Sequence, residues 1–423
     1  MHKAKETFII GFALFSGFFG AGNLILPPFL GLHAGSDWWL VTFGFIISAT
    51  LIPLLALFAH AKLQGTMLDF ANKVSPIFSL LFCLSIYIIS ISLPIPRTAS
   101  VTHEMAISPF FDISPLVTSS IYFALVFVFV MNRNNVLHIL GKILTPLIVI
   151  ILVAIIGIGI FLAPTEMKAS SYKTPFVSGL LEGYQTYDAL GGLLMGGIVT
   201  ISLNLKGYSS FKAKKEIMIK ASILAALGLF VIYTGLIVIG AFYNTQFDST
   251  ITRTALLSEL SLKTLGNIGR LFLSVLVALA CFTTAVTVIV GTADFFKGLF
   301  HQSKMAYVIT AGIACLLGIL VGQFDVHYII KIAVPALLFI YPITVVLIFL
   351  NIMPQKYATP LVFRIVVITT ILFSFPDFLQ AIGYTDNIKN IIELIPLAQH
   401  RLGWVLPALM VFGLVNLIQF KRK

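Results

Sequence analysis

The stretch FFGAGNLILPP, residues 18–28, lies inside an apolar segment and decides the fold. It combines two glycines, an asparagine and two prolines. A helix that only crosses a bilayer has no need of this set, because glycine and proline weaken or break helices. Unwound backbone at membrane depth is tolerated only where it faces protein or a water-filled site. The stretch therefore predicts a broken transmembrane helix with a binding site at the break.

The composition of the whole chain is that of a polytopic membrane protein. Its 423 residues are 59% hydrophobic and 10% charged, with a mean hydropathy of +1.03, whereas soluble domains carry about a quarter charged residues. The net charge is +11, but the basic residues are scattered one to a few per loop. This scatter fits membrane topology and anionic lipid better than nucleic acid. We therefore expect the lipid bilayer as a partner and no nucleic acid.

Apolar segments long enough to cross a bilayer, about 20 residues each, recur along the chain. We expect twelve of them, near 7–32, 38–61, 76–102, 113–131, 143–163, 176–203, 221–243, 269–296, 305–321, 331–350, 360–378 and 404–420. Nothing between them is long enough to be a soluble domain. Placing the N-terminus inside puts most of the 27 Lys and Arg residues on the cytoplasmic side. Both termini are therefore expected in the cytoplasm, in agreement with an even number of helices.

A second glycine-interrupted segment lies five helices further along. The sixth segment contains YDALGG at 187–192 and a second glycine pair at 196–197. Broken helices at matching positions of two halves indicate inverted repeats with a binding site near the midplane. Glycines that merely allow close helix packing are the alternative, but two matched clusters, one with Asn and one with Asp, favour repeats. The predicted division is a first repeat at 1–163, a second at 164–352 and a peripheral pair at 353–423.

The first break offers groups for two kinds of ligand. The amides of Gly20, Ala21 and Gly22 begin the outer half-helix, where the dipole favours a carboxylate. Carbonyl groups at the end of the preceding half-helix suit a small cation. Asn23 either caps the outer half-helix or hydrogen-bonds the ligand, and the sequence leaves both roles open.

The eighth segment contains ACFTTAVT at 280–287. Ala280, Thr283 and Thr284 lie on one helix face, because residues three and four apart are neighbours. Two hydroxyls beside a carbonyl form an oxygen set that can help to hold Na⁺. Taken alone, the residues favour the alternative that the threonines bond back to carbonyls of their own helix.

Charged residues inside the helices are functional candidates by default. Arg97 follows LPIP in the third segment and can meet Asp188, or Glu104 on the same face. We expect a structural or gating ion pair rather than a contact with a substrate carboxylate. Asp188 can instead pair with Asn or Tyr, or carry a proton. Glu182, near the entrance of the sixth segment, is expected to face water.

Two tyrosines are candidates for the wall or gate of a pocket. Tyr187 lies in the second break, and Tyr341 precedes Pro342 in the middle of the tenth segment, where an interfacial aromatic belt is disfavoured. The sequence contains no nucleophile–base pair, no metal-ligand set and no phosphate-binding GxxxxGK[ST]. We therefore expect neither an enzyme nor a need for an ATPase subunit.

Three stretches carry a resemblance to a known family. FGAGNLILPPFLGLHAG at 19–35, PRTASVTHE at 96–104 and GYQTYDALGGLLMG at 183–196 resemble the branched-chain amino acid carriers of bacteria. This leucine–isoleucine–valine–cation symporter family belongs to the amino acid–polyamine–organocation superfamily, and the similarity spans nearly the whole chain. It implies an all-α protein of the bacterial cytoplasmic (inner) membrane with the leucine-transporter fold. That fold has five-plus-five inverted repeats, broken helices 1 and 6 and two peripheral helices.

The resemblance also implies roles for particular residues. It assigns the substrate to the first break, at Gly20, Ala21, Gly22 and Asn23. It assigns a sodium site to the carbonyl groups of the first helix and the eighth-helix set, namely Ser16, Phe19, Ala280, Thr283 and Thr284. The sixth helix is expected to add the substrate contacts Thr186, Tyr187 and Ala189, opposite Tyr341. The arginine that follows the first motif in well-known members has no counterpart, because Leu26 stands there.

These observations together predict a secondary symporter that imports leucine, isoleucine and valine by alternating access. The two-threonine set favours Na⁺ as the coupling ion, with no other cofactor. A proton-coupled carrier for another apolar amino acid is the alternative, since Asp188 can carry a proton. A channel is disfavoured because the polar points are isolated at the paired breaks.

Overall fold

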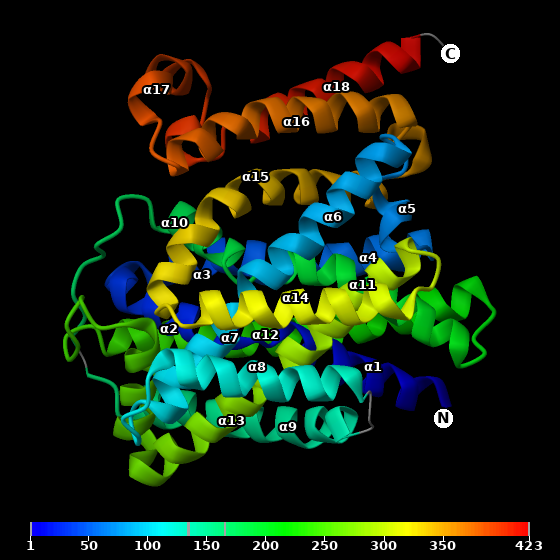
Figure 1. Cartoon of the computed structure of the whole chain (residues 1–423). Coiled ribbons are helices and arrows are strands. Elements are labelled where there is room, and N and C mark those ends of the chain that lie inside the picture. Colours follow the sequence, from blue (N-terminus) through cyan, green and yellow to red (C-terminus); the bar gives the residue numbers. More distant parts are fainter. Residues whose placement is uncertain (1, 133–135, 165, 422–423) are drawn as a thin grey trace.

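The computed structural model describes residues 2–132, 136–164 and 166–421, and this part of the chain is built of helices joined by short connections (Figure 1). Seven helices are long and apolar enough to cross a membrane, or up to eight if the bent pair Pro175–Tyr184 and Asp188–Asn204 counts as one span. Shorter apolar helices cover Pro115–Met131, Pro146–Phe161 and Val405–Phe420. The chain is thus an all-α, multi-pass membrane protein, as predicted.

The helices follow one another closely along the chain. The first half contains α1 (His2–Phe18), α2 (Ala21–Ala34), α3 (Trp38–Ile46), η2 (Ile47–Leu51), α4 (Ile52–Leu63), α5 (Met67–Ala71), α6 (Pro76–Ser92), α7 (Pro94–Thr102), η3 (His103–Ile107), α8 (Pro115–Met131) and α9 (Val136–Phe161). The second half contains α10 (Pro175–Tyr184), α11 (Asp188–Leu205), α12 (Phe211–Phe242), α13 (Arg253–Leu299), α14 (Lys304–Gly322), α15 (Val326–Ile352), α16 (Pro360–Ala381), α17 (Thr385–Leu394) and α18 (Val405–Lys421). Each of the twelve predicted segments lies on one of these helices or on a broken or bent set.

Both predicted helix breaks are present. The first helix stops at Phe18 and resumes at Ala21, and Gly20 caps the new half-helix with extended backbone (φ −103°, ψ −174°). The second break separates α10 from α11, which bend by 42° relative to each other. Tyr187 adopts a left-handed conformation there (φ 62°, ψ 11°), a strained state for a residue other than glycine, of a kind that clusters at functional sites.

Each broken helix packs along both halves against helices of the other half of the chain. Helices α1 and α2 pack on α12, whereas α10 packs on α3 and α11 on α4. The outer halves approach backbone to backbone: a Cβ on Gly31 would lie 1.9 Å from the Ile237 carbonyl oxygen, and one on Gly179 would lie 2.1 Å from the Val41 carbonyl oxygen. The two halves therefore use equivalent contacts, which supports the repeat hypothesis. The boundaries at 163 and 352 stay a prediction.

Two hydrophobic clusters meet at the centre of the molecule. One includes Phe19 and Ala21 of the first break together with α12, and the other includes Tyr187 and Ala189 of the second break together with α15. Helices α16 and α18 pack on each other beyond α15, as expected for a peripheral pair (Figure 1). Helix α1 begins and α18 ends at the same end of the bundle (Figure 1).

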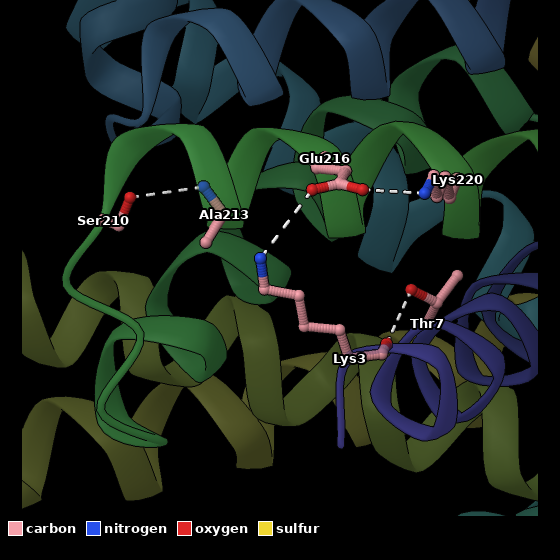
Figure 2. A network of polar contacts seen from close by, with 6 residues as sticks. All are labelled: Lys3, Thr7, Ser210, Ala213, Glu216 and Lys220. Atoms are coloured by element: carbon pink, nitrogen blue, oxygen red, sulfur yellow. Dashed lines mark hydrogen bonds and ion pairs between the residues drawn. The ribbon is translucent and has the colours of Figure 1, made fainter. Parts of the chain in front are cut away.

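Exposed ion pairs tie α1 to the start of α12 at that end. Figure 2 shows the Lys3 ammonium 3.9 Å from the Glu216 carboxylate, which also accepts a hydrogen bond of 2.7 Å from Lys220. Lys206 pairs with Glu6 beside them. Such solvent-exposed pairs are screened and contribute little to stability.

Candidate functional site

The two breaks are joined by a buried carboxylate. The Asn23 amide nitrogen of α2 donates to both Asp188 oxygens of α11, at 2.9 and 2.8 Å. Tyr233 of α12 donates to Asp188 Oδ2 at 3.0 Å and also contacts the Asn23 amide. All three side chains are at most 2% exposed. This arrangement matches the alternative in which Asp188 pairs with Asn and Tyr.

The surroundings of Asp188 supply several hydrogen-bond donors to its carboxyl group. It is the first residue of α11, where the helix dipole favours negative charge. Its oxygens accept hydrogen bonds from the side chains of Asn23 and Tyr233, and hydrogen bonds to a charged group contribute about 1.5–3 kcal/mol each. The carboxylate thereby fixes the two half-helices in register.

Asn23 performs two tasks at once. Its Oδ1 accepts the Gly20 amide at 3.3 Å, which is the capping role left open by the sequence. Its amide nitrogen is occupied by Asp188 and Tyr233. In this state Asn23 therefore organises the break and leaves ligand contact to neighbouring groups.

Arg97 lies between the breaks. Its Nη1 donates to the Gln185 carbonyl oxygen at 2.9 Å, and its guanidinium lies 5.3 Å from the centre of the Tyr187 ring. A Cβ on Gly22 would lie 2.3 Å from Arg97 Nη2, so the guanidinium occupies the space that glycine leaves open. Arg97 is 3% exposed, and within the described residues its Nε has no hydrogen-bond partner.

These contacts correct the ion pair predicted for Arg97. Within the ranges that the structure describes, Arg97 forms no ion pair with Asp188 or Glu104. Helix α6 ends at Ser92, and α7 starts anew at Pro94, which turns Arg97 towards the breaks. Glu104 lies in the π-helical turn η3 and binds the Thr254 hydroxyl and the Val326 amide, the latter at 2.8 Å.

The sixth-helix candidates and Tyr341 meet at the second break. The Thr186 hydroxyl donates to the Gly183 carbonyl oxygen at 2.8 Å, and the Ala189 amide donates to the Tyr341 hydroxyl at 3.4 Å. Tyr341 also stacks on Tyr184 with ring centres 4.2 Å apart. All of them are buried, so aromatic rings line one side of the break.

The sodium candidates lie at the end of α1 and in α13. A Cβ on Gly20 would lie 3.6 Å from Thr284 Cγ2 and 3.9 Å from its hydroxyl oxygen, so Thr284 faces the first break. Thr283 donates to the Ala280 carbonyl oxygen at 3.0 Å, which is the back-bonding that the sequence favoured. Ser16 and Phe19 lie at and just beyond the last turn of α1. The structure thus places Thr284 beside Gly20, and the sodium site as a whole stays a prediction.

The two prolines of the opening stretch lie inside α2. A proline has no amide hydrogen, so Pro27 and Pro28 leave the carbonyl groups of Asn23 and Leu24 without their helical donors. These carbonyl groups lie within the first turn after the break. The prolines therefore add hydrogen-bond acceptors to the site without ending the helix.

Sequence reasoning missed several residues. Tyr233 carries no motif, and Gln185 lies within GYQTYDALGGLLMG but was given no role; only the fold shows their contacts at the breaks. Glu182 was expected to face water, but it forms an ion pair of 2.9 Å with Arg253, and its side chain is 20% exposed. The one signal in the sequence was the position of Glu182, an acidic residue close to the second break.

Comparison with known proteins gives two independent results. A family model described as branched-chain amino acid transport protein matches residues 3–422. The branched-chain amino acid permease BraB of Bacillus subtilis is 33% identical over 418 residues, which cover 96% of this chain and 94% of that protein. The branched-chain amino acid transport system 2 carrier protein of Pseudomonas aeruginosa is 31% identical, covering 96% and 94%.

Solved structures confirm the leucine-transporter-type fold. The inward-facing conformation of Mhp1 matches with a TM-score of 0.60 at 13% identity, over 98% of this chain and 91% of that one. MhsT in complex with L-phenylalanine matches with a TM-score of 0.57 at 16% identity, over 96% and 97%. At these identities the likeness concerns the fold alone. The sequence matches identify the chain as a member of the branched-chain amino acid transport protein family, whose members are carriers and not enzymes.

Proposed function

We propose that this protein is a cation-coupled symporter that imports leucine, isoleucine and valine by alternating access. The observation that carries the proposal is the meeting of both helix breaks around Arg97 and Asp188, one buried charge of each sign. A free amino acid is a zwitterion, so its carboxylate can meet Arg97 while its ammonium needs hydrogen-bond acceptors. The names of the relatives supply the substrate class.

The substrate carboxylate binds at the start of α2. The Ala21 and Gly22 amides are among the first four of that helix, which have no partner within it. Arg97 adds a cation directly beside Gly22, and guanidinium groups recognise carboxylates in bidentate geometry. In this proposal the substrate carboxylate is the anionic partner that Arg97 lacks among the described residues.

The substrate ammonium binds to carbonyl groups. The C-terminal end of α10 presents carbonyl oxygens at the second break, where the helix dipole is negative. The side chain of the substrate lies among Tyr184, Tyr341 and the second break, where it meets an apolar wall. This wall excludes polar substrate side chains because their polar groups would remain unpaired. The three substrates differ by single methylenes, each contributing about 1–3 kcal/mol, so specificity is broad.

Na⁺ binds between α1 and α13 and couples the two fluxes. The ligands are the carbonyl groups of Ser16, Phe19 and Ala280 with the hydroxyls of Thr283 and Thr284. Bound Na⁺ stabilises the outward-facing state and orders the first break before the substrate arrives. The protein lies in the bacterial cytoplasmic membrane with both termini inside, so the end that carries Arg253 faces outward.

A second candidate is a proton-coupled carrier for another apolar amino acid. Asp188 favours it, because this buried carboxylate has amide and hydroxyl partners but no basic side chain as partner in the described part of the chain. Protonation of such a group would release Asn23 and change the register of the breaks. Na⁺ coupling would thus act at Thr283 and Thr284, whereas H⁺ coupling would act at Asp188.

Leucine uptake into proteoliposomes separates the candidates. We expect labelled leucine to accumulate under an inward Na⁺ gradient at equal pH on both sides. Accumulation that ignores Na⁺ and follows a pH gradient selects the proton-coupled carrier. No accumulation under either gradient rejects symport altogether, with binding of leucine to the same preparation as the control for folded protein.

A further inference from the structure

We propose that Arg253, Glu182, Phe29 and His327 form an outer latch that closes the substrate site from the outside. The inference rests on the proposed transport function and assigns a positioning role to residues outside the site. Among the described residues, the contacts given for the latch do not involve the proposed substrate residues.

Arg253 joins four helices through one guanidinium. Its Nη2 forms an ion pair of 2.9 Å with Glu182 at the end of α10, and its Nη1 lies 3.4 Å from His327 Nδ1 at the start of α15. The guanidinium lies 4.2 Å from the centre of the Phe29 ring of α2. Arg253 itself begins α13. Both outer half-helices are therefore fastened to α13 and α15 by one side chain.

The latch lies directly above the substrate site. Phe29 is two helical turns beyond Gly22 on α2, and Glu182 lies three residues before Gln185, which accepts the Arg97 hydrogen bond. Phe29, Arg253 and His327 also line a cavity of about 830 Å³ on the outer side. The latch thus separates this cavity from the two breaks.

The segment that carries Arg253 is a separate helical piece of α13. Gly266 interrupts α13 with non-helical backbone (φ 70°, ψ −169°), a conformation that glycine adopts at little cost. The opposite end of the piece is held by Glu104, whose carboxylate binds Thr254 and the Val326 amide, and its middle is buried at Leu256, Leu257 and Leu260. In this proposal residues 253–265 stay in place while the contacts of Arg253 open and close.

The outer latch is better shielded than the ion pairs at the opposite end. The side chains of Arg253 and Glu182 are 11% and 20% exposed, whereas those of Lys3 and Glu216 are 61% and 44% exposed. Shielded charges attract more strongly than solvated ones because salt and water screen them less. Breaking the outer latch should therefore shift the population towards the outward-open state.

A native cysteine reports on this opening. Cys281 of α13 is fully buried and follows Ala280 at the predicted cation site. In the full-length protein with Cys83→Ser and Cys315→Ser, we measure its labelling by a membrane-impermeant maleimide added outside right-side-out vesicles. We expect Arg253→Ala and Glu182→Ala each to raise the labelling rate about tenfold. Arg253→Lys should give an intermediate rate, because lysine keeps the charge but not the planar contact with Phe29.

The charge-swapped protein and a matched control decide between a latch and general loosening. Arg253→Glu with Glu182→Arg should restore a rate within about threefold of the parent. Lys3→Ala removes a lysine that forms an exposed ion pair with Glu216 at the opposite end of the bundle, and it should leave the rate unchanged. Unchanged labelling in both single variants, or an equal rise in Lys3→Ala, overturns the proposal. If the parent takes up no leucine, the transport function fails, while the labelling rates still decide whether the latch exists.

Discussion

Replacing Gly22 with alanine tests the contact between Arg97 and the first break. The added Cβ would lie 2.3 Å from Arg97 Nη2 and 2.9 Å from its Cζ, well inside contact distance. The guanidinium must move, and its 2.9 Å hydrogen bond to the Gln185 carbonyl oxygen is strained or lost. A hydrogen bond to a charged group contributes about 1.5–3 kcal/mol, which corresponds to ~10- to ~150-fold in an equilibrium constant.

The assay is equilibrium binding of labelled leucine to purified protein, with uptake measured in parallel. Gly22→Ala should weaken leucine binding by that factor while the protein remains folded, since alanine favours helix at this position. Gly291→Ala is the matched control, because a Cβ there meets nothing within 4 Å among the described residues. Binding by Gly22→Ala within about threefold of the parent would refute the placement of Arg97 at the carboxylate end of the site.

Three further changes test the other parts of the site. Asp188→Asn should reduce leucine uptake ~100-fold or more, because the amide group cannot accept from Asn23 and Tyr233 on both sides; near-normal uptake at unchanged expression would contradict the role of the carboxylate. Tyr233→Phe removes one hydrogen-bond donor to Asp188 and should lower the melting temperature of the solubilised protein. An unchanged melting curve would contradict this expectation. Thr284→Ala should raise the Na⁺ concentration for half-maximal uptake more than Thr283→Ala, since only Thr284 faces Gly20; equal effects would remove the distinction.

The sequence was sufficient for the architecture because glycine, proline and hydropathy act locally. The breaks at Gly20 and Tyr187 follow from backbone requirements that can be seen without tertiary contacts. Span lengths follow from bilayer thickness. The capping contact of Asn23, one of the two roles that the sequence left open, is also local, since capping depends on residues within one turn.

The partners of the buried charges could not be predicted in the same way. Arg97 and Glu104 are seven residues apart and share a face of an ideal helix, but α7 ends at Thr102 and Glu104 lies in the π-helical turn at 103–107. Asp188 is 45 residues from Tyr233 and 165 from Asn23, so these contacts depend on the packing of distant helices. Arg253 and Glu182 are 71 residues apart, so their ion pair depends on tertiary packing in the same way.

The most direct test of the central claim is the linkage between leucine and Na⁺ in binding, without any transport step. At constant pH, Na⁺ should increase the affinity for leucine, and leucine should increase the affinity for Na⁺ by the same factor, because linkage is reciprocal. Thr284→Ala should reduce this factor, whereas Gly291→Ala should preserve it. Leucine affinity that does not change with Na⁺ but changes with pH would contradict Na⁺ coupling at the first break.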